Sequence, residues 1–432
     1  MFRIHRSPLM SQKQSIYERL PFFYGWLIFL AAFLSYMFMY GLRYSIGVIF
    51  VPLQNEFGWT SAMTAGAVTA FFWVYGFAAL FIWRLCERIG VRRTVFIGGL
   101  LLGLGGLLAS FSRELWHLYA TWGIFAATGS SIIYTVQNMV LGRFFSKHRG
   151  KAVGWSSIGI SAAQAALVPF AAWATAQYGW RSAFTVLSLF VLVGVSLPCY
   201  LLFRENPESI GLGKDGADLA SPNTELDAES MKTGMTMWTT ERVLGNRSFM
   251  LILISYFFQV GGVVSLLTFV VPHIIRLGID PLVASTAIGI IGVMSAIGSF
   301  IFGFVSDLIG RKYTIAIATG GIAASMLVST IIPPTIIFLY AWVTIYGLTY
   351  GGAPEQYAAI VTDYFGSGKD IALFGYVMFA GALGGGLFPL IGGYLSDLTG
   401  NYYASLLFLG LGMLGAVITI LPAKKPEQVP NV

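Results

Sequence analysis

Long apolar runs dominate this chain of 432 residues. An α-helix needs about 20 predominantly apolar residues to cross the hydrocarbon core of a bilayer. Runs of this kind occupy roughly residues 22–50, 61–83, 94–112, 116–141, 151–176, 182–203, 248–275, 283–305, 313–332, 335–362, 371–396 and 402–422. Only helices and closed barrels satisfy their backbone groups in lipid, and these runs are too long for barrel strands. The expected fold class is therefore an all-α membrane protein with twelve transmembrane helices.

Composition supports a surface that faces lipid. Only 10% of the residues are charged and 56% are hydrophobic, whereas soluble domains usually carry about 25% charged residues. The net charge of +7 does not indicate a nucleic-acid partner, because the basic residues lie in short loops between apolar runs. Cys86 and Cys199 predict no disulfide framework. The expected partners are the lipid bilayer and a small solute, and the chain is expected to be a monomer.

The placement of lysine and arginine predicts the orientation. If the N-terminus lies inside, the inner segments hold 22 of these residues and the outer loops hold three. Such a bias favours both termini on the cytoplasmic side of the plasma membrane (the inner membrane of a bacterium). The first apolar run is too long for a signal peptide and lacks a small-residue cleavage site, so we expect it to be retained.

The two halves of the sequence repeat at one constant offset. CERIG at 86–90 matches SDLIG at 306–310, and Val-Pro pairs, phenylalanines and prolines recur at the same spacing. Parallel repeats of six helices are therefore expected. The predicted segments are an N-tail (1–21), an N-terminal six-helix bundle (22–203), a partly disordered cytoplasmic linker (204–247), a C-terminal six-helix bundle (248–422) and a C-tail (423–432).

Two loops carry a motif of charges and glycines. GFVSDLIGRKYT at 303–314 resembles the signature loop of the major facilitator superfamily, and WRLCERIGVRRT at 83–94 is a degenerate first-half copy. The resemblance implies the twelve-helix fold of these transporters. The residues of these loops that we expect to gate transport are Glu87, Arg92, Arg93, Gly303, Asp307, Gly310, Arg311 and Lys312. Their contacts would differ between transport states; the alternative is that the charges only set topology.

A narrower resemblance lies between the fourth and fifth spans. RFFSKHRGKAVGWSSIGISAA at 143–163 is similar to a motif of the monocarboxylate transporter family. The matching residues are Phe144, Phe145, Lys147, His148, Arg149, Ala152 and Gly154. FFYGWLI at 22–28 resembles the start of that family's first span, and RENPESIGLGKDG at 204–216 resembles a segment of bacterial relatives that include oxalate/formate antiporters.

The sequence departs from this family at its usual cations. Ser299 stands where many members carry an arginine in span eight, and residues 371–396, span eleven, contain no basic residue. If the substrate is a carboxylate, its positive partner must come from another position.

Arg43 is the candidate for that partner. A cation at bilayer depth costs at least about 2.5–3.5 kcal/mol, so it tends to face a wet cavity, a counter-ion or a substrate. Tyr36, Tyr40, Arg43 and Gly47 share one helical face, and Arg43 lies about seven residues from the predicted outer end of its span. The guanidinium suits a carboxylate. The alternative is a structural cation held by helix-end carbonyls or by Glu56.

Polar residues on other spans are weaker candidates for the same cavity. The resemblance implies that spans one, four, seven and ten line the central passage. The candidates on spans four, seven and ten are Tyr134, Gln137, Asn138, Tyr256, Gln259, Tyr346 and Tyr350. Each has the alternative of a helix-packing or interfacial role.

Two acids of span ten have separate predicted roles. Glu355 follows Gly351, Gly352 and Pro354, which interrupt the helix, and it is the candidate for proton coupling. Its alternative is a packing group bonded to Gln356 or to a tyrosine. Asp363, at the inner end of the span, is expected to pair with cations of the signature loop and to contribute to gating.

The leading hypothesis is secondary active transport of a small organic anion, a monocarboxylate of the lactate or pyruvate type. Alternating access would be driven by proton symport or by anion exchange. The alternative is a major facilitator transporter of another class: oxalate/formate exchange, an inorganic anion or drug efflux. No phosphate-binding loop of the GxxxxGK[ST] type and no metal-ligand cluster is present in the sequence, so no enzyme activity and no cofactor are expected.

Overall fold

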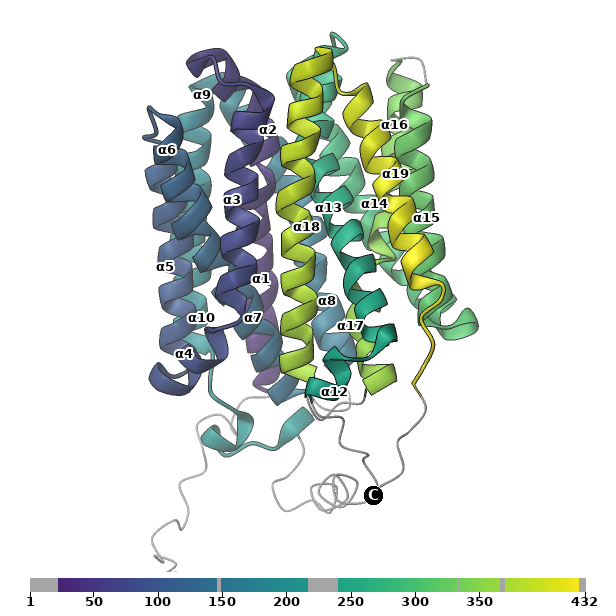
Figure 1. Cartoon of the computed structure of the whole chain (residues 1–432). Helices are drawn as coiled ribbons and strands as arrows, with labels where there is room; N and C mark the ends of the chain where they lie inside the picture. Colours follow the sequence, from purple (N-terminus) through teal and green to yellow (C-terminus); the bar gives the residue numbers. More distant parts are fainter. Residues whose placement is uncertain (1–21, 146–148, 217–239, 332–334, 366–369, 427–432) are drawn as a thin grey trace, which may run out of the picture.

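The computed structural model describes residues 22–145, 149–216, 240–331, 335–365 and 370–426, and it describes Glu355 and a few residues beside the gaps by backbone only. The regular structure within these ranges is helical. The helices run side by side in two groups, the earlier one purple to teal and the later one green to yellow (Figure 1). These groups are called the first half and the second half.

The helices of the first half include three π-helical stretches. Their bounds are α1 (Gly25–Tyr44), α2 (Ile46–Phe57), α3 (Ser61–Ala79), α4 (Ile82–Ile89), α5 (Val91–Ala109), α6 (Leu115–Leu118), η2 (Tyr119–Ala126), α7 (Ala127–Phe144), α8 (Arg149–Ala162), η3 (Ala163–Leu167), α9 (Val168–Val191), η4 (Leu192–Ser196) and α10 (Leu197–Leu202).

The connecting segment and the second half follow. Their bounds are η5 (Pro207–Ile210), η6 (Lys214–Gly216), α12 (Thr240–Leu244), α13 (Arg247–Arg276), α14 (Pro281–Ile309), α15 (Arg311–Ser329), α16 (Ile336–Gly351), α17 (Pro354–Phe365), α18 (Asp370–Thr399) and α19 (Tyr403–Ile420).

Eleven helical stretches in the described part of the chain are long and apolar enough to cross a membrane. One of them, Gly154–Leu202, has 49 residues, about twice the length that a single crossing needs. Gly179 divides it, because its backbone adopts φ +82° and ψ +158°, which a helix does not tolerate. Ten single crossings and this pair give the twelve spans expected from the sequence.

The first span is longer than predicted. The sequence suggested an end near residue 50, but α2 continues the direction of α1 as far as Phe57. Arg43 therefore lies 14 residues from that end instead of about seven, since 57 minus 43 is 14. At 1.5 Å per residue this is about 21 Å of helix, so the arginine sits near the middle of its span.

The predicted repeat is visible in the backbone of the two loop motifs. Gly90 and Gly310 have the same conformation, φ +83° and ψ +157°, and each ends one helix and starts the next. The hydroxyls of Thr94 and Thr314 donate to the carbonyls of these glycines at 2.8 and 3.0 Å. A positive φ of this size strongly favours glycine. The two halves thus build the same turn at the positions that the sequence repeat pairs.

Close helix packing within each half relies on glycine. A Cβ atom on Gly351 of α16 would overlap the carbonyl oxygen of Ser295 on α14, and one on Gly384 of α18 would overlap that of Phe257 on α13. In both pairs the obstacle is backbone, which cannot rotate away. Small residues at such crossings let helix backbones approach closely, as in other membrane bundles.

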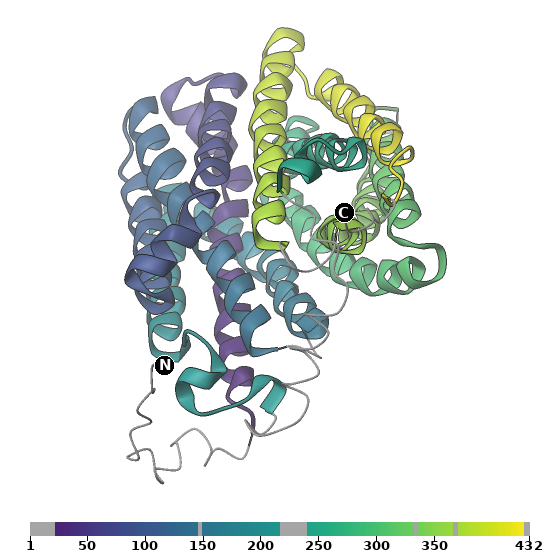
Figure 2. The same cartoon turned by 60° about the horizontal axis from the view of Figure 1, so that its bottom comes forward.

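The two halves meet mainly along α3 and α18, and α13 and α14 of the second half also contact α2, α8 and α9 of the first. Figure 2 shows α18 at the border between the groups. The end of the molecule at which α10 ends and α13 begins is called the linker end here. The other end, with Gly58, Gly278 and Gly400, is called the opposite end.

Candidate functional site

Arg43 is buried in the middle of the first span. Its exposed fraction is 9%, and it forms no hydrogen bond or ion pair with any residue that the structure describes. The Nε atom in particular is buried without a partner. Leaving a buried charged donor unpaired is costly, so this arginine is a strong candidate for contact with a ligand or with water.

Four aromatic rings, called the cage below, surround the guanidinium of Arg43: those of Tyr40, Phe71, Phe72 and Tyr75. Its Cζ atom lies 4.4 Å from the ring centroid of Phe72. The centroids of Tyr40 and Tyr75 lie at 5.2 Å and that of Phe71 at 5.3 Å. All four rings are within the distance of a cation–π contact, about 6 Å. They stabilise the charge through their faces, but they do not replace the in-plane acceptors that the N–H groups require.

A small cavity of about 20 Å³ lies beside Arg43. Its walls come from both halves: Arg43, Tyr44, Ile46, Val68, Phe71, Phe72 and Trp122 from the first, and Val264, Leu267 and Thr268 from the second. The volume suits roughly one water molecule. The arginine therefore faces the interface between the halves and does not face lipid.

Glu56, considered above as a counter-ion for Arg43, has other partners. Its carboxylate accepts hydrogen bonds from Arg181 at 2.6 Å and from Trp180 at 2.7 Å. These contacts tie the end of α2 to α9. The alternative in which Glu56 holds Arg43 is therefore wrong, because the carboxylate is held near the opposite end of the molecule, well beyond the reach of the guanidinium.

Four predicted residues of spans one and four lie next to the rings that surround Arg43. Tyr36 is buried and its ring lies 6.2 Å from that of Tyr40 and 5.8 Å from that of Tyr134. Tyr134 also lies 6.4 Å from Tyr75, a residue of the cage around Arg43. Asn138, one turn along α7, donates to the carbonyl of Tyr134 at 2.9 Å. Together they form an aromatic wall of the first half.

The two predicted tyrosines of span ten reach this wall through Tyr44. Tyr346 stacks on Tyr350, with ring centroids 6.0 Å apart. The hydroxyl of Tyr350 lies 3.3 Å from that of Tyr44, the neighbour of Arg43 in sequence. This hydrogen bond joins the two halves. The hydroxyl of Tyr346 is buried and has no partner among the described residues.

The remaining three predicted residues, Gln137, Tyr256 and Gln259, are buried between helices and do not line the cavity. The amide nitrogen of Gln137 donates to the carbonyl of Ala32 at 3.3 Å and so joins α7 to α1. The ring of Tyr256 packs 4.8 Å from Tyr357 within the second half. Gln259 is 1% exposed, and its amide nitrogen has no described partner. Gln137 in particular fits the packing role that was its alternative.

Ser299, at the position of the missing arginine of span eight, has a packing role. Its hydroxyl donates to the carbonyls of Ser295 at 3.0 Å and Gly351 at 2.8 Å. It thus joins α14 to α16. The positive charge beside the cavity comes from Arg43, on the first half.

Glu355 lies at the start of α17, directly after the break that the sequence predicted between Gly351 and Pro354. Its side chain lies outside what the structure describes, so its role in proton coupling stays a prediction.

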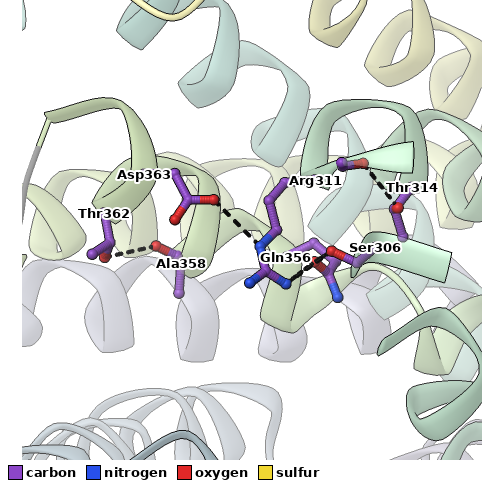
Figure 3. Close-up of polar contacts among 8 residues, drawn as sticks. Ser306, Arg311, Thr314, Gln356, Ala358, Thr362 and Asp363 are labelled. Carbon is purple, nitrogen blue, oxygen red and sulfur yellow. Dashed lines mark hydrogen bonds and ion pairs between the residues drawn. The ribbon is translucent and has the colours of Figure 1, made fainter. Parts of the chain in front are cut away.

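The signature loop of the second half is organised by Arg311. Its Nη1 atom donates to Ser306 at 2.8 Å and to Gln356 at 3.1 Å (Figure 3). Its Nε atom donates to the carboxylate of Asp363 at 3.4 Å. The pairing expected for Asp363 is present and joins α15 to α17. Asp307, the acidic position of the motif, is exposed.

The first-half copy uses an acid that the motif analysis missed. Glu205 accepts a hydrogen bond from the backbone N–H of Val91 at 2.7 Å and so caps α5. Its carboxylate also lies 3.7 Å from Arg143. Glu87, the expected acidic member, is exposed instead. A cap needs an acceptor in front of the helix, and the chain beyond α10 places Glu205 there.

The other predicted gating residues lie in the helices beside these turns and are exposed or half-buried. Arg92 donates to the carbonyl of Tyr200 at 2.9 Å, and Arg93 is exposed. Lys312 lies 4.9 Å from the ring of Tyr313, and a Cβ atom on Gly303 would meet open space. Their role in gating stays a prediction.

At the opposite end the halves are joined by a carboxylate. Asp397 of α18 accepts hydrogen bonds from the backbone N–H groups of Ser61 and Ala62, both at 2.8 Å. These are the first two residues of α3, so the acid caps a helix of the other half. The side chain of Arg276 adds a weaker contact to Ser61 at 3.4 Å.

Apolar contacts between α2 and α13 also join the halves, farther from the opposite end than this cap. The rings of Phe50 and Phe269 meet edge to face at 5.7 Å. A Cβ atom on Gly47 would come within 2.9 Å of the carbonyl oxygen of Leu267. Gly47, expected on a cavity-facing stripe, is thus a point of close contact between α2 and α13.

The sequence analysis missed several residues around Arg43. Phe71, Phe72 and Tyr75 lie in an apolar run with no distinguishing pattern, so nothing marked the face they occupy. Tyr44 is adjacent to Arg43 but lies off the stripe that was used. A search for aromatic residues on every face within one turn of the arginine would have added only Tyr44 to Tyr40.

Comparison with known proteins agrees with this architecture. The sequence matches the model of the Major Facilitator Superfamily over residues 28–354 and again over 252–432. Monocarboxylate transporter 13 of Bos taurus is 26% identical over 94% of this chain and 93% of its own length. Monocarboxylate transporter 11 of Mus musculus is 28% identical over 89% of this chain and 84% of its own length.

A solved structure shows the same fold. The D-xylose-proton symporter superposes with a TM-score of 0.71 over 93% of this chain and 98% of its own, at 17% identity. Identity this low shows the fold alone. With the twelve spans, the repeated glycine turns and the family match over most of its length, the chain belongs to the major facilitator superfamily.

Proposed function

We propose that this chain is a secondary active transporter of a small organic anion, a monocarboxylate of the lactate or pyruvate type. The superfamily and the names of its relatives support transport of a small solute. We further propose that the linker end faces the cytoplasm and that the protein lies in the plasma membrane. The two halves would rock about a central site and expose it to each side in turn.

The observation that carries this proposal is the environment of Arg43. The Arg43 guanidinium lies in the middle of a span, is surrounded by rings and has no acidic partner among the described residues. Its N–H groups therefore lack hydrogen-bond acceptors in their plane. A carboxylate satisfies it with two parallel, charge-assisted hydrogen bonds. A neutral sugar or an apolar drug would leave the charge uncompensated, so an anion is the better match.

The cavity beside Arg43 is too small for such a substrate in this conformation. About 20 Å³ suits one water, whereas sites for small molecules usually measure about 300 Å³ or more. Binding therefore requires the halves or the rings to move. Closure at the opposite end by Asp397 and by Phe50 against Phe269 supports a cycle in which that end opens at another stage.

Two ways of driving transport remain in the proposal. In anion exchange a second anion binds Arg43 for the return step, so the site returns loaded. In proton symport a titratable group accompanies the substrate, and Glu355 is the candidate because it follows the break in span ten.

The test is counterflow in proteoliposomes with monocarboxylates, oxalate, formate and nitrate, comparing wild type with Arg43→Gln, Arg43→Lys and Arg113→Gln. Arg113 is an exposed arginine of a loop at the opposite end and serves as the matched control. Because hydrogen bonds to a charged group contribute about 1.5–3 kcal/mol, Arg43→Gln should lower carboxylate exchange about ten- to hundredfold. Arg43→Lys should retain part of it, and Arg113→Gln all of it.

Equal exchange by wild type and Arg43→Gln, with both proteins folded by size-exclusion chromatography, would remove Arg43 as the anion anchor. Exchange restricted to oxalate and formate or to nitrate would replace the monocarboxylate with that anion class.

A further inference from the structure

The ring nearest to the Arg43 guanidinium comes from the second span. The centroid of Phe72 lies 4.4 Å from Cζ, whereas the next ring of the cage lies at 5.2 Å. Phe72 is 5% exposed and also lines the cavity. A cation this close to a ring face is held with its plane and direction restricted.

The ring of Phe72 also contacts the second half of the protein. A Cβ atom on Gly385 of α18 would lie 2.6 Å from Cδ1 and 2.9 Å from Cε1 of this ring. Real Cβ atoms do not approach other atoms so closely, so any side chain at position 385 would displace the ring. Gly385 thus allows α18 to support Phe72, and Phe72 in turn supports Arg43.

The next glycine along α18 makes the same kind of contact away from the cage. A Cβ atom on Gly386 would overlap the indole nitrogen of Trp73, the neighbour of Phe72. Trp73 is 45% exposed and makes no cation–π contact with Arg43. Gly385 and Gly386 therefore form a matched pair: both crowd α3 against α18, but only the first acts on the ring beside Arg43.

We propose that Phe72 is a positioning residue for anion binding, and that Gly385 couples the position of the Phe72 ring to the second half. This rests on the proposed role of Arg43 as anchor. A guanidinium that lies over a ring face keeps its in-plane N–H groups free for a bidentate carboxylate. Without the ring, Arg43 keeps its charge but loses its fixed plane, so affinity for the anion falls while the translocation step is retained.

The test measures KM and kcat for carboxylate uptake in proteoliposomes for Phe72→Leu, Phe72→Tyr, Gly385→Ala and Gly386→Ala, beside wild type and Arg43→Gln. A cation–π contact of this kind contributes about 0.5–2 kcal/mol. Phe72→Leu should therefore raise KM about tenfold and change kcat less than twofold. Phe72→Tyr, which keeps the ring face, should restore KM. Gly385→Ala should raise KM, and Gly386→Ala should not.

An unchanged KM in Phe72→Leu, while Arg43→Gln loses exchange, overturns the positioning role alone. Equal increases in KM for Gly385→Ala and Gly386→Ala also overturn it, because they would indicate general disturbance of the α3–α18 contact. Wild-type KM in Arg43→Gln overturns the anchor and this inference together. If Phe72→Leu does not yield folded protein, the comparison of the two glycine variants decides.

Discussion

The two ends of the interface between the halves are held in different ways. At the opposite end, Asp397 of the second half accepts two hydrogen bonds from the start of α3 in the first half, both at 2.8 Å. At the linker end, Arg311 bonds to Ser306, Gln356 and Asp363, all of its own half.

The first half repeats this pattern at the linker end. Glu205 contacts Val91 and Arg143, both within the same half. In both halves, therefore, the charged residues at the motif loops bond to residues of their own half. The comparison indicates that a charged group, Asp397, joins the halves at the opposite end, whereas the contact between the halves toward the linker end is apolar, as between the rings of Phe77 and Phe379.

Covalent fixation of the opposite end should have the largest effect. The Oδ2 atom of Asp397 on α18 lies 2.8 Å from the backbone nitrogen of Ala62 on α3, so Ala62→Cys and Asp397→Cys place two thiols close enough for a cross-link. If this end must open in every cycle, oxidation should abolish uptake nearly completely, and reductant should restore it. The measurement is carboxylate uptake in proteoliposomes before oxidation, after oxidation and after reduction.

The two single-cysteine variants under the same oxidant are the controls for this cross-link. Full transport by the oxidised double variant, with the disulfide verified by mass, would mean that the α3–α18 contact at this end stays closed throughout the cycle.

Removal of the Asp397 charge should have a smaller effect. Asp397→Asn keeps the shape but weakens the cap of α3, and helix caps contribute about 0.5–2 kcal/mol. We expect the population open at the opposite end to rise about fivefold, for a change near 1 kcal/mol. The measurement is the rate at which an impermeant maleimide labels Thr268→Cys in the cavity, with Cys86 and Cys199 replaced by serine.

Asp280→Asn is the matched control for this labelling. Asp280 also caps a helix at the same end, with a 2.8 Å hydrogen bond from the N–H of Leu282, but that helix belongs to its own half. An equal rise in labelling for both variants would mean that crossing between halves gives Asp397 no special importance.

The smallest effect is expected at the linker end. The side chains of Arg311 and Asp363 are 34% and 50% exposed, and exposed ion pairs contribute about 0.2–1 kcal/mol. A double-mutant cycle of Arg311→Gln and Asp363→Asn, followed by thermal unfolding in detergent, should give a coupling energy of about 0.5 kcal/mol. A coupling energy well above the range of exposed ion pairs would show that this contact within the second half is stronger than its exposure indicates.

The expected fold follows from features that depend little on packing. Run lengths predict spans because bilayer thickness sets helix length, and the sequence repeat reappears as identical turns at Gly90 and Gly310. The end of the first span was misplaced, near residue 50 instead of at Phe57, because Gln54, Asn55 and Glu56 are polar although they continue the helix. Polarity marks the edge of the apolar run, not the end of the hydrogen-bonded turns.

The candidate site was predictable only in part. Arg43 was found because a charge in an apolar run is conspicuous in any sequence. Phe72 and Gly385, which support it, lie in different halves of the chain and resemble many other apolar and small residues. Their significance arises only where α3 meets α18.

The sequence by itself determined the number of spans, the repeat of the two halves and the presence of a cation within the membrane, because each of these follows from residue type along one helix. The tertiary structure alone decided that Asp397 joins the halves at the opposite end, that Glu56 bonds to Arg181 and Trp180, and which rings enclose Arg43. These depend on contacts between helices distant in the chain, which local periodicity does not encode.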